Sequence, residues 1–404
     1  MTTQVNAKPP SGLAKVWPID GFVTFWALAI VALLTLIIAL ETATFLWVLF
    51  LVACVMGVAM FHSGLGFTGA WRNFVLTGKA TGMRAQLLLL GLAALIIVPF
   101  VSGAVDVGAA PTTAPLGISL LVGAFIFGFG MQLGGACGSG TLFTLGSGNQ
   151  RMLVTFVFFI VGAFIGSMQQ MWWLALPSIP AVLLYESLGT VLAIALQLAF
   201  VAALWWWFGR RETRLMGKQA NGLLLNSQEP LSKRLLLGPW ALAAAAVILV
   251  LGNLLTVILS GSPWGITFAY ALWGAKVAQF VGVDVASNAF WITDFAALSL
   301  QDSVLVNVNS VMAMGIILGA MLAAGLANRF AAANPAKLPW RSLLAAVIGG
   351  LLMGYGGRIG FGCNIGALFS GVASASLHAW VWFALAFAGS YVGIKVRPWF
   401  GLAN

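Results

Sequence analysis

The sequence GFGMQLGGACGSGTLF at residues 128–143 returns in the second half of the chain as GYGGRIGFGCNIGALF at residues 354–369. The two copies align without gaps and share the pattern G-[FY]-G-x3-G-x2-C-x2-G-x-L-F. The alignment places Cys137 opposite Cys363 and Gln132 opposite Arg358. Chance would give roughly one or two identities in an alignment of this length, whereas the two copies share the seven fixed positions of this pattern. The sequence therefore indicates an internal duplication.

The composition around these copies belongs to a membrane protein. Apolar residues make up 61% of the 404 residues and charged residues only 7%, whereas soluble domains carry roughly 25% charged residues. Long unbroken apolar runs also argue against a transmembrane β-barrel, whose strands alternate with period two. We therefore expect an all-α, polytopic transmembrane helical bundle made of two repeats.

The net charge of +10 does not indicate a nucleic-acid partner. Positively charged cytoplasmic loops account for most of it, and the remaining cations favour small anions. The predicted setting is membrane lipid, which the chain crosses several times.

About eleven apolar runs are long enough to cross a bilayer, at roughly 17–25 residues each. We expect a polar tail at residues 1–20, a first transmembrane repeat at 21–208, a basic cytoplasmic loop at 209–238, a second transmembrane repeat at 239–397 and a tail at 398–404. Eleven full crossings would put Arg329, Lys337 and Arg341 outside, against the positive-inside rule. One apolar run in the second half is therefore expected to be partial or split.

The glycine-rich copies are poor at continuing a helix, because each glycine costs about 1 kcal/mol relative to alanine. We expect both to be re-entrant loops or pairs of half-helices that meet mid-membrane, where broken backbone survives only inside protein or beside a wet cavity. The segments from Thr141 and Ala367 would then direct unpaired amides inward, which suits an anion. The alternative is that G-x-x-x-G spacing merely lets helices pack closely.

The cysteines are the candidate chemical groups. Cys54, inside an apolar run, is interpreted as a small hydrophobic residue, but Cys137 and Cys363 occupy equivalent places in the two copies. A thiol is a weak donor that suits large, soft acceptors, so sulfur recognition or sulfur chemistry is expected. Three cysteines without a C-x-x-C pair argue against a disulfide scaffold or a zinc site. No cofactor motif or catalytic triad appears, so no cofactor and no enzymatic activity is predicted.

Several polar or flexible neighbours of the cysteines complete the predicted site. Arg358 would attract the anion, or would instead be an interfacial anchor. The hydroxyl and amide groups would donate hydrogen bonds to the substrate, or bond only a local carbonyl. The candidate substrate-contacting residues are Cys137, Cys363, Gln132, Arg358, Gly138, Ser139, Thr141 and Asn364.

At these two stretches, and at GLGFTGAWR (residues 64–72), the sequence resembles the YeeE/YedE family of bacterial inner-membrane proteins. The resemblance implies import of thiosulfate or a related sulfur-containing ion, relayed by thiols at a constriction of short broken helices. It assigns Cys137 and Cys363 to that relay, and it implies a sulfurtransferase-like partner in the cytoplasm. Family members commonly carry a further cysteine where this chain has Gly66. The resemblance makes Gly66 a further candidate site residue, although it supplies no thiol.

Three functional classes follow. The first is a transporter of a small sulfur-containing anion, most simply thiosulfate, or of a selenium compound. The second is a membrane thiol oxidoreductase or sulfur carrier in which Cys137 and Cys363 are oxidised or carry a persulfide. The third is a structural subunit with a packing-only core.

Overall fold

The structure, a computed structural model, describes residues 19–42, 45–219, 222–224, 230–331 and 338–403. The predicted polar tail at residues 1–20 and Lys337 thus lie outside the described residues, apart from residues 19 and 20. The first half contains α1 (Gly21–Glu41), α2 (Leu46–Ser63), α3 (Phe67–Thr77), α4 (Thr81–Val101), α5 (Ile118–Gly134), α6 (Gly138–Gly146), α7 (Gln150–Met168), α8 (Gln170–Leu174), α9 (Leu184–Leu188) and α10 (Thr190–Met216).

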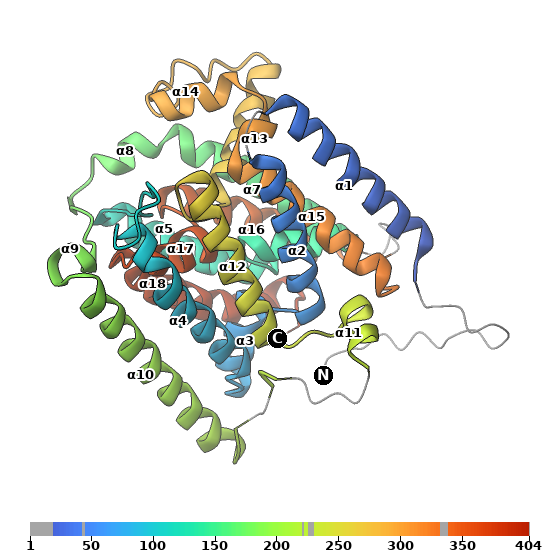
Figure 1. The fold of residues 1–404 in the computed structure, drawn as a ribbon, viewed down its shortest axis with the longest axis vertical. Coiled ribbons are helices and arrows are strands. Elements are labelled where there is room, and N and C mark those ends of the chain that lie inside the picture. The colour runs from blue at the N-terminus through green and yellow to red at the C-terminus, as the bar shows by residue number, and fades with distance from the viewer. Residues whose placement is uncertain (1–18, 43–44, 220–221, 225–229, 332–337, 404) are drawn as a thin grey trace.

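The second half is also helical (Figure 1). It contains α11 (Leu231–Leu237), α12 (Leu242–Ser260), α13 (Thr267–Phe280), α14 (Asp294–Gln301), η1 (Val304–Val306), α15 (Val308–Leu326), α16 (Trp340–Ile359), η3 (Asn364–Phe369), α17 (Ser370–Ala373), α18 (His378–Val396) and η4 (Arg397–Phe400). Two short strands, β1 (Leu116–Gly117) and β2 (Ser178–Ile179), pair antiparallel.

Within the described residues, ten helical segments are long and apolar enough to cross a membrane. The sequence predicted about eleven runs, one of them incomplete, and α13 accounts for the difference. It is a helix of 14 residues, shorter than the roughly 20 residues that a crossing needs. The prediction of a polytopic helical bundle is confirmed.

Small residues let the central helices come close together. Helix α16 packs against α5 and α7, and α18 packs against α5. A methyl group on Gly130 of α5 would lie 2.9 Å from the backbone nitrogen of Met353, and one on Gly356 would lie 2.7 Å from the carbonyl oxygen of Gly123. Only glycine fits such backbone contacts. The two glycine-rich copies therefore lie side by side on α5 and α16.

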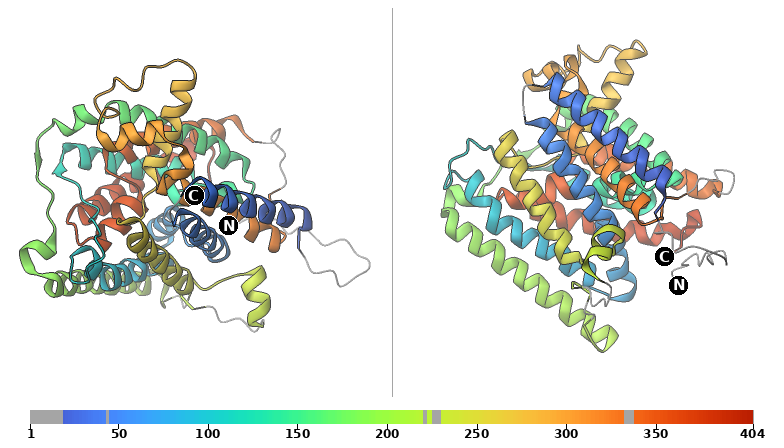
Figure 2. Two further views of the ribbon diagram at one scale, coloured as in Figure 1. Left: turned by 45° about the horizontal axis from the view of Figure 1, so that its top comes forward. Right: turned by 45° about the vertical axis from the view of Figure 1, so that its right-hand side comes forward.

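Helices α1 and α10 lie at opposite edges of the bundle (Figures 1 and 2). Both expose apolar side chains along most of their length, such as Phe22 on α1 and Leu192 on α10. Helix α10 runs on beyond residue 208 to Met216 and so includes Arg210 and Arg211 at the start of the predicted basic loop. The site is built from the helices between these two edges.

Candidate functional site

Each glycine-rich copy ends one helix and starts another at its cysteine. Helix α5 ends at Gly134, Gly135 adopts a left-handed φ of 95°, and Cys137 is the extended residue before α6. In the second copy α16 ends at Ile359, and Cys363 is the extended residue before the π-helix η3. Both cysteines thus stand at a helix start, where backbone N–H groups lack acceptors within the helix. That these breaks are re-entrant at mid-membrane stays a prediction.

The two copies meet at Gly138. A methyl group on this glycine would lie 2.8 Å from the Sγ atom of Cys363 and 3.1 Å from its Cβ. Cys137 is 1% exposed and Cys363 is fully buried, and both are free thiols. The Tyr270 hydroxyl donates to the carbonyl of Gly138 over 3.2 Å and holds this junction from α13. The sequence-predicted proximity of the two cysteine segments is therefore present in the structure.

Cys137 lines a cavity of about 530 Å³. One wall is formed by α3 and the loop before it, which includes the candidate Gly66, and another by α6 and the residues before it. Leu242, the first residue of α12, also lines this cavity. Cys363 does not, so the Gly138 junction separates it from the cavity.

A second cavity, of about 270 Å³, lies at the other end of α12. It is lined by Ser260, the last residue of this helix, and by Asn309 among others. Gly265 borders Asn309, because a methyl group on this glycine would lie 3.1 Å from the Asn309 Oδ1 atom. A methyl group on Gly366, three residues after Cys363, would in turn lie 3.9 Å from the Cα of Gly265. The two cavities therefore approach the cysteine junction from opposite ends of a membrane-length helix.

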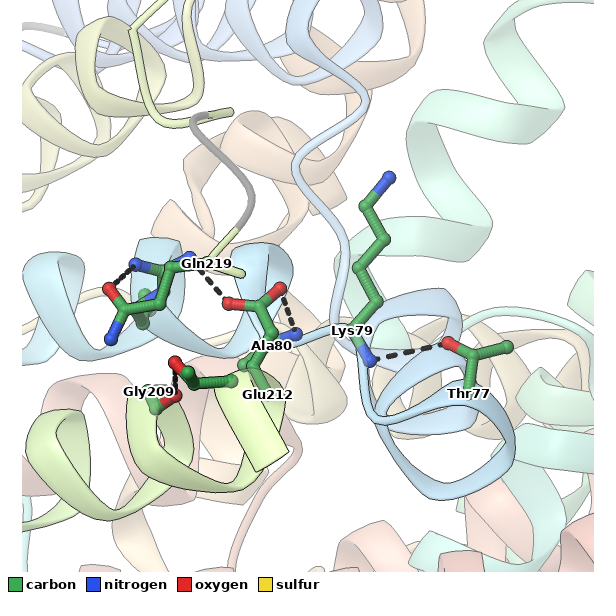
Figure 3. Close-up of polar contacts among 8 residues, drawn as sticks. Thr77, Lys79, Ala80, Gly209, Glu212 and Gln219 are labelled. Atoms are coloured by element: carbon green, nitrogen blue, oxygen red, sulfur yellow. Dashed lines mark hydrogen bonds and ion pairs between the residues drawn. The ribbon is translucent and has the colours of Figure 1, made fainter. Parts of the chain in front are cut away.

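The edge of the larger cavity carries a cation. Lys79 lines the cavity and is exposed. Its side chain extends away from the nearby Glu212 carboxylate (Figure 3). That carboxylate instead accepts from the backbone nitrogen of Ala80 over 3.0 Å and pairs with Arg84 over 2.7 Å. The buried acid is thus neutralised, and Lys79 leaves this edge of the cavity positive.

The predicted polar residues beside the cysteines differ in how they are bonded. The Ser139 hydroxyl lies 3.7 Å from the Cys137 Sγ, whereas the Thr141 hydroxyl donates to the Cys137 carbonyl over 2.8 Å. Asn364 is fully buried, and both polar atoms of its side chain lack a partner in the described structure. Of these three side chains, Asn364 is therefore the one whose donor and acceptor are both left to bind a substrate.

Gln132 and Arg358 match in the alignment but have different surroundings. Gln132 donates to the Thr68 carbonyl over 3.1 Å and to the Ser390 hydroxyl over 2.7 Å. The Arg358 guanidinium donates to Gln170 and stacks at 4.9 Å from the ring centre of Phe290. Neither residue lines either of the two cavities described above. Their observed contacts hold neighbouring helices in place.

Arg151 is a residue whose local role sequence reasoning missed. It lies in the first turn of α7 and donates to the carbonyls of Leu133 and Gly134 over 2.5 and 2.6 Å. These are the last carbonyls of α5, and no N–H group of that helix donates to them. The only sequence signal is a lone arginine shortly after the first glycine-rich copy, and it does not show what the side chain contacts. Among the described residues, no group of three or more histidine, cysteine or acidic side chains is placed to hold a metal ion.

These features define a class: a multi-pass helical membrane protein whose paired cysteine segments meet between two cavities. The chain belongs to the sulphur transport family, whose model matches residues 62–392. It is 26% identical to the thiosulfate transporter TsuA of Spirochaeta thermophila over 83% of this chain and 94% of that protein.

Two further relatives are matched over shorter stretches. The probable transporter YedE of Escherichia coli is 33% identical over 34% of this chain, and that of Salmonella typhimurium is 31% identical over 39%. The matched region spans about a third of the length of each YedE protein, 33% and 37%.

Proposed function

We propose that this protein carries a small sulfur-containing anion, with thiosulfate as the first candidate, across the bacterial inner membrane. The ion would pass the Cys137–Gly138–Cys363 junction between the two cavities. The observation that carries the proposal is the arrangement of these cavities at opposite ends of α12, with the two thiol segments between them. The likeness to TsuA, named a thiosulfate transporter, supports the choice of ion.

The chemistry of the junction fits a soft anion. Thiols are weak hydrogen-bond donors, and sulfur is a large, polarisable acceptor. The helix starts at α6 and η3 add backbone N–H groups and the positive end of a helix dipole. Cys137 and Cys363 would contact the terminal sulfur in turn, and Ser139 and Asn364 would donate to its oxygens. Gly66, which lines the larger cavity, supplies no thiol, so the relay in this chain has two thiols.

Several finer elements belong to the same proposal. Transport would depend only indirectly on Gln132, Arg358 and Thr141, because these residues hold the Cys137–Gly138–Cys363 junction in position. Surrounding lipid solvates the exposed apolar faces of the outer helices. A sulfurtransferase-like protein would receive the ion in the cytoplasm.

Uptake of labelled thiosulfate tests the proposal directly. Cells that lack their own sulfur-anion uptake would express the full chain, and unlabelled thiosulfate, sulfite, hydrosulfide and selenosulfate would compete. We expect saturable uptake that thiosulfate inhibits best. Uptake no higher than in cells without the protein would contradict the proposal, and stronger inhibition by selenosulfate would assign the selenium compound instead.

Cysteine variants test the role of the thiols. Cys137→Ala and Cys363→Ala should each reduce uptake by at least about tenfold, a loss equivalent to one weak contact at the barrier. Cys54→Ala is the matched control, because Cys54 is a buried cysteine of α2 that lines neither cavity. Unchanged uptake in Cys137→Ala would remove the thiols from the mechanism and favour a packing-only role.

The thiol state separates transport from redox chemistry. A relay by hydrogen bonds needs free thiols, so uptake should persist in a phosphine reductant. An oxidoreductase must pass through a disulfide or a persulfide, so the same reductant would stop it. Loss of activity in the phosphine would therefore support the oxidoreductase alternative.

A further inference from the structure

Three helices begin at the wall of the larger cavity. Its lining includes residues from the first turns of α3 and α4, and from the start of α6. The first N–H groups of a helix have no acceptor within that helix, and together they carry a partial positive charge. Two of these starts, those of α3 and α4, lie beside each other, because a methyl group on Gly82 would be 2.5 Å from the Ala70 Cβ. The function proposed above uses only the third start, at α6.

Two buried hydroxyls stand at this pair of helix starts. Thr68 is 3% exposed and Thr81 is 6% exposed, and both line the cavity. Neither Oγ1 atom has a hydrogen-bond partner in the described structure. Native proteins pair nearly all of their buried polar groups, so two unpaired hydroxyls at one cavity wall indicate a bound group that completes them. A hydroxyl can donate to an anion at either position.

The surroundings select a negatively charged partner. Lys79, between α3 and α4, lines the same cavity, and the lining residues within the described part of the chain include no carboxylate. The Glu212 carboxylate, which does not line the cavity, is engaged by Ala80 and Arg84 (Figure 3). The wall therefore combines amide N–H groups, two free hydroxyls and one cation, which matches the oxygens of a tetrahedral oxyanion.

The wall is held rigid from behind. The Gln86 side chain accepts from the Trp71 indole over 2.8 Å and donates to the Gly66 carbonyl over 3.1 Å, which ties α3 to α4. Gln132 donates to the carbonyl of Thr68 over 3.1 Å and ties the same turn to α5. A binding wall fixed by such contacts loses little freedom when an ion binds.

We propose that Thr68, Thr81 and the first-turn amides of α3 and α4 form an oxyanion subsite in the larger cavity. It binds the three-oxygen end of thiosulfate and leaves the terminal sulfur toward Cys137 in the same cavity. Sulfate is held by the same groups, because it presents the same oxygens. The identity of the transported ion rests on the function proposed above, whereas the subsite itself predicts binding of any small tetrahedral oxyanion.

Threonine-to-valine variants test the subsite, since each replaces one hydroxyl by a methyl group of similar size. Thr68→Val and Thr81→Val should each raise the KM for thiosulfate uptake roughly tenfold and leave the maximal rate near that of the unmodified protein. Inhibition by sulfate should weaken in the same proportion. Inhibition by thiocyanate, which has no oxygen atoms, should stay unchanged. Thr256→Val is the matched control, because Thr256 is buried and its hydroxyl already donates to the Gly252 carbonyl over 2.8 Å.

Two results would overturn the subsite while leaving transport intact. One is a KM within about twofold of the unmodified protein in both variants. The other is an equal loss of sulfate and thiocyanate inhibition, which would indicate general damage to the cavity. If the unmodified protein takes up no thiosulfate, calorimetric titration of the purified full chain with sulfate still decides. Binding that weakens in both variants supports the subsite, and no binding to the unmodified protein refutes it.

Discussion

Gly138 is the residue at which the two cysteine segments come together. Its lack of a side chain lets the Cys363 sulfur approach α6, and its carbonyl is held by Tyr270. The sequence alignment paired Gly138 with Asn364, but it could not show that Gly138 faces the cysteine of the opposite copy. A side chain at this position would therefore crowd the Cys363 sulfur.

Gly138→Ala tests this contact. The added methyl group would lie 2.8 Å from the Cys363 Sγ, and overpacking of this kind costs about 1–3 kcal/mol. We expect thiosulfate uptake to fall about tenfold or more, as measured by initial rates. Gly21→Ala is the control, because nothing lies within 4 Å of a methyl group at that position. Equal uptake in the two variants would show that the junction is not the constriction.

At the scale of elements, the end of α5 needs support from another helix. Gly134 and Gly135 end α5 and leave its last carbonyls without partners in the helix. Arg151 and Thr155 of α7 bind the Gly134 carbonyl over 2.6 and 3.1 Å. The break in the helix is encoded locally by glycine, and its exact shape is set by α7.

Arg151→Gln tests that support. Hydrogen bonds from a charged group contribute about 1.5–3 kcal/mol each, so the variant should unfold at lower temperature and place Cys137 less precisely. We expect a loss of uptake together with a lower melting temperature of the purified protein. Arg341→Gln, which removes the same charge from an exposed side chain, is the control. The role assigned to Arg151 is wrong if the two variants melt and transport alike.

At the scale of the whole molecule, the outermost helices have little protein around them. Helix α10 packs mainly on α4 and α9 at one edge of the bundle (Figure 1). The buried Arg84–Glu212 pair joins α4 to α10 beside the larger cavity, and Arg84 also donates to Gln219 over 3.1 Å. This pair fixes an edge helix that apolar packing alone would hold loosely in lipid.

Glu212→Gln should therefore destabilise the assembly. Removing one partner of a buried ion pair costs about 3–5 kcal/mol. We expect a clear drop in the thermal stability of the purified protein. The double variant Arg84→Leu with Glu212→Leu should recover part of that loss, because no buried charge is left. A double variant less stable than Glu212→Gln would refute the assignment.

The sequence alone predicted the helical membrane class, the count of spans to within one and the duplicated cysteine stretches. These follow from composition, from apolar run length and from glycine, all of which are local properties. It also identified Cys137 and Cys363 as equivalent positions. The sequence did not reveal the roles of Lys79 and Arg151, because what a side chain faces depends on partners far along the chain.

Only the tertiary structure decided which residues meet. It placed Gly138 against Cys363, held Gln132 and Arg358 in contacts between helices, and left Thr68, Thr81 and Asn364 with unpaired polar atoms. The physical reason is that hydrogen bonds and close contacts join segments more than a hundred residues apart, as from Gln132 to Ser390. No periodicity within one segment records such pairings.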